Sequence, residues 1–163
     1  MKAAPAVWHN QAILYQAELS LNGDLNELER LSAGVAQFCS GCRLDDDAEF
    51  QLNLVLEELF VNSLKHGGCK GMPNCARVRL RGTADGVEVE YRDRGHPFDP
   101  TETPAVNIHA SLAERSEGGL GIHLVREIMR DVRYERDGEW NRVTMWRPAA
   151  QAEETREKGQ QDL

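Results

Sequence analysis

The segment VLEELFVNSLKHGG, residues 55–68, combines an apolar helical pattern with a polar stripe and decides the fold. Glu58, Asn62 and His66 are four residues apart, so a helix places them on one face. Most of their neighbours are apolar, which predicts a largely buried helix. A polar group buried without a partner costs about 1–3 kcal/mol. The stripe is therefore expected to face a polar ligand or, as an equally open alternative, an internal hydrogen-bond network.

Periodic patterns before this segment predict a strand and a first helix. Residues 11–21 alternate partly and predict the strand, and apolar residues recur at helical spacing over 25–38. Asp24 is expected to cap that first helix. Three carboxylates at 45–47 predict the start of the second, buried helix, because the helix dipole favours negative charge there. Gly67 is expected to end it.

The second half of the chain predicts two hairpins separated by a long loop and a helix. A loop of such length within a compact domain is usually functional. Together the elements predict an α/β (α+β) two-layer sandwich, with a mixed, largely antiparallel sheet and helices on one face. The predicted elements are strands at 76–83 and 86–94, a loop at 95–118, a helix at 121–130, and strands at 132–136 and 142–148.

Composition limits the classes of partner. The formal net charge of −8 over 163 residues argues against binding to a nucleic-acid backbone. No apolar run approaches the ~18 residues that a bilayer span needs, and no secretory pattern is seen at the start. We therefore expect a cytoplasmic protein with no membrane partner. Residues 11–148 are expected to form the domain, residues 1–10 an N-terminal extension, and residues 149–163 a disordered tail.

Four cysteines invite a zinc interpretation, because Cys39 and Cys42 form a C-x-x-C pair and Cys69 and Cys75 a C-x5-C pair. The predicted second helix separates the two pairs by roughly 30 Å. All four thiolates would have to lie within ~2.3 Å of one zinc ion. We therefore do not expect one zinc site.

Two further segments contain residues suited to binding a ligand. In YRDRGHPFDP (91–100), Asp93 ends a strand and Gly95 begins a loop. A carboxylate can accept a hydrogen bond from an amine there, while the glycine lets the backbone approach a flat ring. A simple turn is the favoured alternative for this segment alone. In EGGLGIHLVREIM (117–129), glycines before a helix predict an anion site, although a glycine-rich loop alone is a weak signal.

Taken together, three motifs resemble the GHKL ATPase superfamily, the Bergerat-type ATP-binding fold shared by histidine kinases and gyrase. They are ELFVN-x3-H (58–66), DRGHPFD (93–99) and GGLGIHLVREIMRDVRYER (118–136). More narrowly, they are similar to anti-sigma factor serine-protein kinases. The resemblance covers roughly residues 12–148 and implies a site for ATP and Mg²⁺.

The resemblance also implies roles at the centre of that site. Asn62 resembles the magnesium ligand, and Glu58 matches the proposed general base four residues earlier on the same helical face. Asp93 resembles the carboxylate that accepts from the adenine amino group. Gly95 matches the glycine that lies against the purine.

The other candidates are expected at the adenine edge and around the phosphates. Thr144 resembles a threonine near the adenine, although an ordinary strand threonine is equally open. Lys65, His66 and Arg115 could contact phosphates. Alternatively, Lys65 is only an exposed residue at the helix end, His66 caps the helix, and Arg115 is a solvated loop residue. The turn expected to hold the phosphates consists of Gly119, Leu120 and Gly121.

By resemblance, the chain is expected to be a regulatory serine/threonine-protein kinase of the anti-sigma factor type. Such a protein phosphorylates a STAS-type antagonist, can bind a sigma factor and commonly forms a homodimer. The loop 99–118 is expected to become ordered by ATP. Two alternatives remain open at this point: an ATP-binding partner-switching module without significant kinase activity, and a detached ATPase domain of a phosphorelay.

Overall fold

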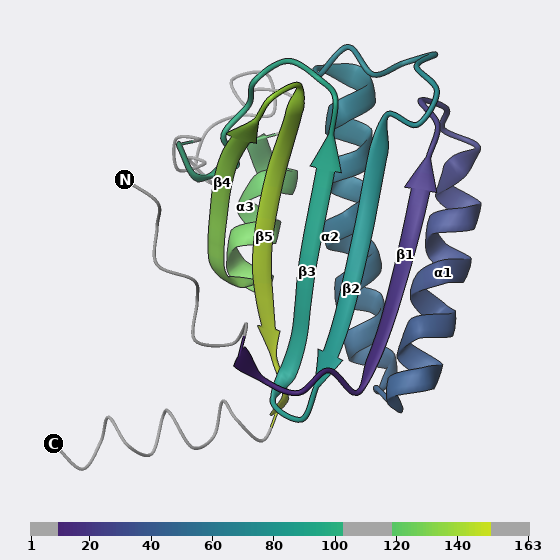
Figure 1. Cartoon of the computed structure of the whole chain (residues 1–163), viewed down its shortest axis with the longest axis vertical. Coiled ribbons are helices and arrows are strands. Elements are labelled where there is room, and N and C mark those ends of the chain that lie inside the picture. The colour runs from purple at the N-terminus through teal and green to yellow at the C-terminus, as the bar shows by residue number, and fades with distance from the viewer. Residues whose placement is uncertain (1–9, 103–118, 151–163) are drawn as a thin grey trace, which may run out of the picture.

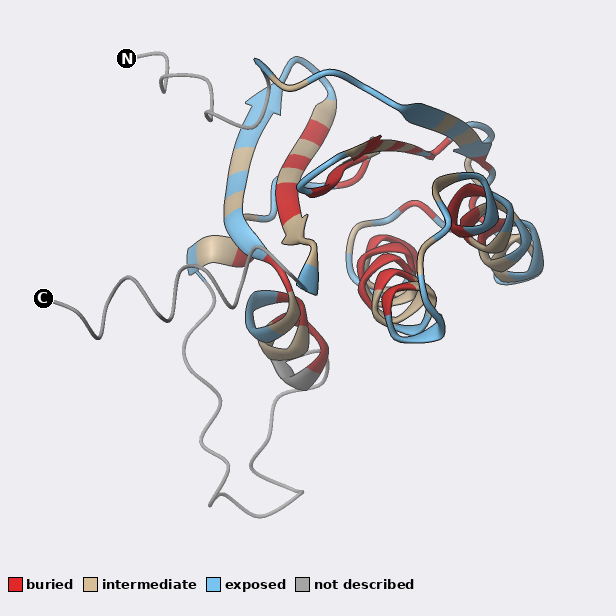
Figure 2. Ribbon diagram, turned by 90° about the horizontal axis from the view of Figure 1, so that it is seen from below, coloured by how far each residue is buried: buried red, intermediate tan, exposed pale blue. Residues whose placement is uncertain are grey.

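In the computed structural model, which describes residues 10–102 and 119–150, helices lie on one face of a five-stranded sheet (Figures 1 and 2). The strand order is β1-β2-β3-β5-β4, and every neighbouring pair is antiparallel. This arrangement confirms the predicted two-layer sandwich. The strands are β1 (Tyr15–Leu21), β2 (Ala76–Thr83), β3 (Gly86–Asp93), β4 (Arg130–Asp137) and β5 (Trp140–Pro148). The helices are α1 (Glu27–Cys42), α2 (Asp46–Lys65) and α3 (Gly119–Ile128), with a 3-10 turn at Pro100–Glu102.

The helix starts show which capping predictions hold. Asp45 is the N-cap of α2, and its carboxylate accepts a hydrogen bond from the Ala48 backbone N–H at 2.8 Å, as the run of carboxylates predicted. The prediction for Asp24 is wrong, because α1 begins only at Glu27 and its N-cap is Asn26. The Asp24 side chain instead accepts from the Asn26 N–H and forms the turn before the helix.

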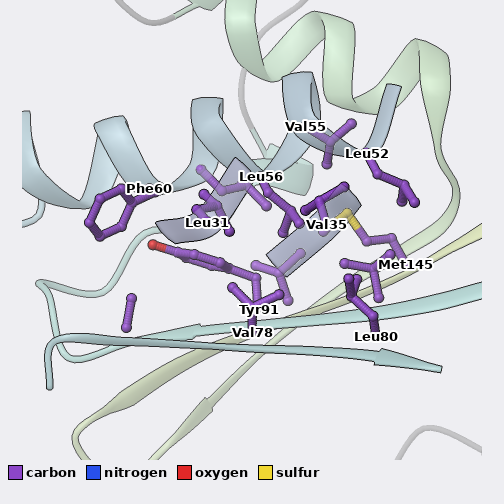
Figure 3. Packing of buried hydrophobic residues seen from close by; sticks show 14 of the residues in the cluster. Leu31, Val35, Leu52, Val55, Leu56, Phe60, Val78, Leu80, Tyr91 and Met145 are labelled. Carbon is purple, nitrogen blue, oxygen red and sulfur yellow. The ribbon is translucent and has the colours of Figure 1, made fainter. Parts of the chain in front are cut away.

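Alternation along the strands divides their side chains between two faces. Residues facing the helices form the core, as Figure 3 shows for Val78, Leu80, Tyr91 and Met145. Burying a large apolar side chain contributes about 1.5–3 kcal/mol, so this layer holds the helices on the sheet. Figure 3 also shows Tyr91 lying across the space between the sheet and α2.

The other side of the sheet, here called the open face, carries mainly charged residues. The strand register places Arg79 opposite Glu90, and Glu90 opposite Thr144. One row further along, Arg77 lies opposite Arg92. The open face comprises residues 16, 18 and 20 of β1, 77, 79 and 81 of β2, 88, 90 and 92 of β3, 140, 142, 144 and 146 of β5, and 130, 133, 135 and 137 of β4.

Two other features of the chain complete the fold. Helix α3 begins at Gly119, two residues earlier than predicted. The predicted long loop largely falls on residues 103–118, which lie outside the described residues. Within the described ranges, none of the helices combines the length and apolar character that a bilayer crossing requires.

Candidate functional site

The C-terminal half of α2 and the start of α3 meet directly. A Cβ atom on Gly121 would overlap the Glu58 carboxylate, so this glycine allows α2 and α3 to approach each other. The first turn of a helix has free backbone N–H groups and the positive end of the dipole. The structure therefore brings Glu58 and Gly121, two predicted site residues, to a place suited to negative charge.

Asp93, at the end of β3, is held by neutral hydrogen-bond donors. Its Oδ1 accepts from the Gly95 backbone N–H at 2.8 Å and from the side-chain amide of Asn141 at 2.9 Å. Its Oδ2 accepts from the Ser63 hydroxyl of α2 at 3.0 Å. A carboxylate has about four acceptor positions, so acceptor capacity remains on Oδ2 for a further donor. No cation compensates its charge in these contacts.

Tyr91 extends this network into the core. Its hydroxyl lies 2.7 Å from Ser63 Oγ. Full burial, followed by the nearby charge of Asp93, raises the pKa of Tyr91 well above its ordinary value, so the phenol keeps its proton. Tyr91 can therefore donate to Ser63 while Ser63 donates to Asp93. The same Ser63 hydroxyl also lies 3.0 Å from the Leu59 carbonyl, an alternative acceptor within α2.

Gly95 is required by close packing. A Cβ at this position would lie 2.8 Å from both Asp93 Oδ1 and the Gly67 carbonyl oxygen. The neighbouring His96 N–H donates to that same carbonyl at 2.9 Å. The turn after β3 is therefore fastened to the residues that follow α2, and Gly95 leaves the backbone surface beside Asp93 without a side chain.

Asn141 is the site residue that sequence reasoning missed. Its side-chain amide donates to Asp93 and, at 2.8 Å, to the His96 carbonyl. Its Oδ1 accepts from the Tyr134 hydroxyl at 2.7 Å and from Arg136 at 3.1 Å. Asn141 is only 3% exposed. Asn141 lies two positions before Val143, so alternation along the strand places both side chains on the same face. Only the pairing of β5 with β3 shows that this position lies opposite Asp93.

The remaining predicted residues of α2 occupy its last turn and the residue that follows. Asn62 lies one turn after Glu58, and its side chain forms no hydrogen bond with any residue in the described ranges. Its carbonyl accepts from the backbone N–H of His66, which is the C-cap of the helix. Lys65 and His66 are exposed, so both side chains remain accessible to a ligand at this end of α2.

One predicted residue, Thr144, is not brought into this cluster, and two others are not described at the level of their side chains. Thr144 lies on the open face opposite Glu90, whereas Asp93 faces the helices, so the expectation for Thr144 is not met. Alternation alone did not reveal this, because the face depends on strand register. Arg115 lies outside the described residues, and for Leu120 only its place in the backbone of α3 is described.

The four cysteines lie outside the Asp93 hydrogen-bond network. Cys39 and Cys42 belong to the last turn of α1, whereas Cys69 and Cys75 follow the far end of α2. Burial, followed by the charge of Glu49, raises the pKa of Cys39 to about 11, which disfavours its thiolate. Within the described residues, no three or more histidine, cysteine or acidic side chains are grouped to hold a metal ion.

Comparison with known proteins agrees with this geometry. The family model described as the histidine kinase-like ATPase domain matches residues 21–147. The serine/threonine-protein kinase BtrW of Bordetella bronchiseptica is 31% identical over 96 residues, which cover 59% of this chain and 68% of that protein.

A solved structure shows the same fold. It is the crystal structure of the RsbU and RsbW domains of Rv1364c from Mycobacterium tuberculosis, with a TM-score of 0.60 and 13% identity. The match covers 82% of this chain and 32% of that one, so the present chain spans about a third of its length. At this identity, the likeness concerns the arrangement of helices and strands alone.

Proposed function

The chain belongs to the histidine kinase-like ATPase domain family, and from that premise we propose that it binds Mg-ATP and phosphorylates a serine of a partner protein. The observation that carries the proposal is the Asp93 cluster at the end of β3. A carboxylate held by three neutral donors retains acceptor capacity for one more, and adenine offers an amino group. Gly95, beside it, has no side chain that would cover a planar ring.

The phosphates would lie toward the start of α3. Backbone N–H groups at Gly119 and Gly121 can donate to phosphate oxygens, and the helix dipole favours the negative charge. The Glu58 carboxylate lies against Gly121, which supports a general base close to the proposed position of the phosphates. Lys65 and His66, exposed at the end of α2, are proposed as outer contacts to the phosphates.

Asn62 fits a magnesium ligand. Its amide oxygen is a hard donor of the kind Mg²⁺ accepts, and no described residue occupies it with a hydrogen bond. Bound Mg²⁺ would offset the charge of the phosphates during transfer. The Asn62 side chain would therefore orient the metal ion, while Asp93 would orient the adenine ring of ATP.

The proposed transfer moves one phosphoryl group and one proton. The serine oxygen of the partner forms a bond to the γ-phosphorus, the bond from that phosphorus to the β–γ bridging oxygen breaks, and ADP leaves. Glu58 takes the hydroxyl proton. We propose a STAS-type antagonist as the phosphorylated partner and a sigma factor as a further partner, in a cytoplasmic homodimer. The kinase relative BtrW supports the serine/threonine specificity.

The test uses γ-labelled ATP and a STAS-type antagonist that co-purifies differently with ATP and with ADP. Glu58→Gln should still bind nucleotide but transfer phosphate roughly 10²–10⁴ times more slowly, the usual contribution of general acid–base catalysis. Glu57→Gln, one residue earlier on another part of α2, is the matched control and should transfer at the wild-type rate. Asn62→Ala should impair Mg-ATP binding and transfer together.

Two outcomes would contradict these assignments. Equal transfer rates for wild type and Glu58→Gln would show that Glu58 is not the base. A verified partner that distinguishes ATP from ADP but is never labelled by the wild type would replace the kinase with an ATP-controlled binding module.

A further inference from the structure

The open face of the sheet has no covering layer among the described residues. Helices α1, α2 and α3 contact β1, β3 and β4, and all three lie on the other side of the sheet (Figure 2). A sheet face left to solvent ordinarily carries scattered polar side chains. Here the side chains form an ordered ion-pair network instead, which calls for a specific explanation.

Glu90 lies at the centre of that network, beneath arginine side chains. Its carboxylate accepts from Arg142 Nε at 2.8 Å and from Arg92 Nε at 3.0 Å, and a terminal nitrogen of Arg79 lies 3.7 Å away. Burial by itself would raise the pKa of Glu90, but the Arg142 hydrogen bond and the three positive charges lower it below 4.5. One carboxylate thus holds three guanidinium groups.

Around Glu90, the arginine side chains are partly exposed and the carboxylate is buried. The side chains of Arg79, Arg92 and Arg142 are 35%, 27% and 30% exposed, whereas that of Glu90 is 7% exposed. Directly over Glu90, an approaching molecule therefore meets guanidinium groups, whereas the exposed carboxylates of Glu18 and Glu135 pair with the outer sides of Arg79 and Arg142. Guanidinium groups present several N–H donors in a planar fork, which matches the two oxygens of a carboxylate.

A hollow of about 420 Å³ lies over this part of the face. Arg77, on its rim, is exposed and lies with its guanidinium 4.8 Å from the centre of the Trp140 ring. No ion pair of Arg77 occurs within the described residues. Its charge is therefore not matched by a neighbouring carboxylate. The hollow is lined by Glu18, Leu19, Ser20, Arg77, Val78, Arg79, Glu90 and Arg92.

The charge of this face is opposite to that of the chain. The paired positions of the open face hold seven arginines and five acidic residues, which leaves +2, although the whole chain carries −8. Glu88 and Glu90 are buried beneath the arginines, whereas Glu18, Glu135 and Asp137 are exposed. The residues counted are Arg77, Arg79, Arg81, Arg92, Arg130, Arg133 and Arg142, with Glu18, Glu88, Glu90, Glu135 and Asp137.

We propose that the open face docks an acidic segment of a partner protein, whose carboxylates pair with Arg77, Arg79 and Arg92 in the hollow. A few carboxylates match the small excess of positive charge. A nucleic-acid strand matches it less well, because its continuous phosphate charge would be repelled by the acidic remainder of the chain. The surface lies on the opposite side of the sheet from Asp93, so docking there leaves the proposed nucleotide site accessible.

The probe is a fluorescein-labelled deca-glutamate peptide, titrated with the full chain and followed by fluorescence anisotropy. A labelled decathymidylate of similar length is the nucleic-acid arm. The peptide should bind at about 50 mM NaCl and dissociate at about 300 mM, because salt screens exposed charges. Arg77→Glu should weaken peptide binding at least about tenfold, since it places like charges in contact.

Arg43→Glu is the matched control, because it changes the net charge equally at an exposed position between α1 and α2. It should alter peptide affinity less than about twofold. Arg92→Gln, which keeps a donor beside Glu90, should weaken binding in the same direction as Arg77→Glu. The proposal is overturned by absence of peptide binding at low salt, by equal losses in Arg77→Glu and Arg43→Glu, or by tighter binding of the decathymidylate.

Discussion

Two of the three carboxylates of strand β3, Glu90 and Asp93, lie in contrasting environments on opposite faces of the same sheet. Asp93 faces the helices and is held by a hydroxyl, an amide and a backbone N–H, all of them neutral. Glu90 faces away and is held by three guanidinium groups. Three residues along one strand therefore separate a site that presents a negative acceptor from a surface that presents positive donors.

The contrast shows that the partners of a carboxylate determine what it can do. Neutral donors fix the orientation of Asp93 but leave its charge uncompensated, so a neutral amine can still gain from binding it. The arginines around Glu90 compensate its charge and exceed it, so Glu90 organises cations and has little acceptor capacity to offer. The predicted consequence is that Glu90 matters for stability and Asp93 for ligand recognition.

Replacing Glu90 should have the largest effect. Glu90→Gln should lower the free energy of unfolding by about 3 kcal/mol, because three arginines lose the buried anion that they share. The partial exposure of the arginines places the loss at the low end of the usual range. Urea unfolding followed by circular dichroism measures it, and ATP affinity should remain unchanged. Unchanged stability would contradict the central place of Glu90.

The pH dependence of stability should follow the same carboxylate. The pKa of Glu90 in the folded state is lowered below its ordinary 4.5. A lowered folded-state pKa contributes stability above the unfolded value, and that contribution is lost as pH falls through the folded value. Wild type should therefore lose its stability advantage over Glu90→Gln below about pH 4.5. A constant difference down to about pH 3 would contradict this prediction.

Asp93→Ala should weaken ATP binding by about 1.5–3 kcal/mol, the range for a hydrogen bond to a charged group. Glu88→Ala provides the contrast, because Glu88 lies on the same strand but on the open face. It should leave ATP affinity unchanged. Isothermal titration calorimetry in the presence of Mg²⁺ measures both. Equal losses in the two variants would remove the distinction between the faces of β3.

Asn141→Asp should make ATP binding depend on pH. It places a second carboxylate where the amide now lies 2.9 Å from Asp93, and two such groups share one proton. At low pH that proton restores the hydrogen bond, and at high pH the two charges repel. ATP affinity of the variant should therefore fall with rising pH, relative to wild type. Parallel pH profiles would show that Asn141 does not orient Asp93.

The smallest effect is expected at Tyr91. Tyr91→Phe removes one hydroxyl from the network but leaves Ser63 able to donate to Asp93. Stability should fall by about 1 kcal/mol, the net contribution of a typical hydrogen bond. ATP affinity should change less than about threefold. A larger loss of affinity would place Tyr91, rather than Asn141, in control of the Asp93 orientation.

Local sequence patterns were sufficient for the parts of the fold and site that depend on local spacing. The period of α2 placed Glu58 and Asn62 on one face, and the glycine after β3 marked Asp93. The role expected for Thr144 was not met, and Asn141 was missed. Both depend on the register of β5 against β3, which no local pattern specifies.

The burial of Glu90 was equally inaccessible to sequence reasoning. Alternation along β3 predicts that Glu88, Glu90 and Arg92 face solvent, and they do lie on the face without helices. Glu90 is nevertheless buried, because arginines from β2, β3 and β5 meet over it. Only the pairing of strands distant in sequence brings those side chains together.

The most direct test of the nucleotide site compares ATP with GTP by calorimetry on the wild-type chain in the presence of Mg²⁺. Asp93 only accepts hydrogen bonds, and guanine presents a carbonyl oxygen where adenine presents an amine. ATP should therefore bind at least about a hundredfold more tightly than GTP, since a buried polar mismatch discriminates strongly. Comparable affinities for the two nucleotides would contradict the assignment of Asp93 as the residue that recognises adenine.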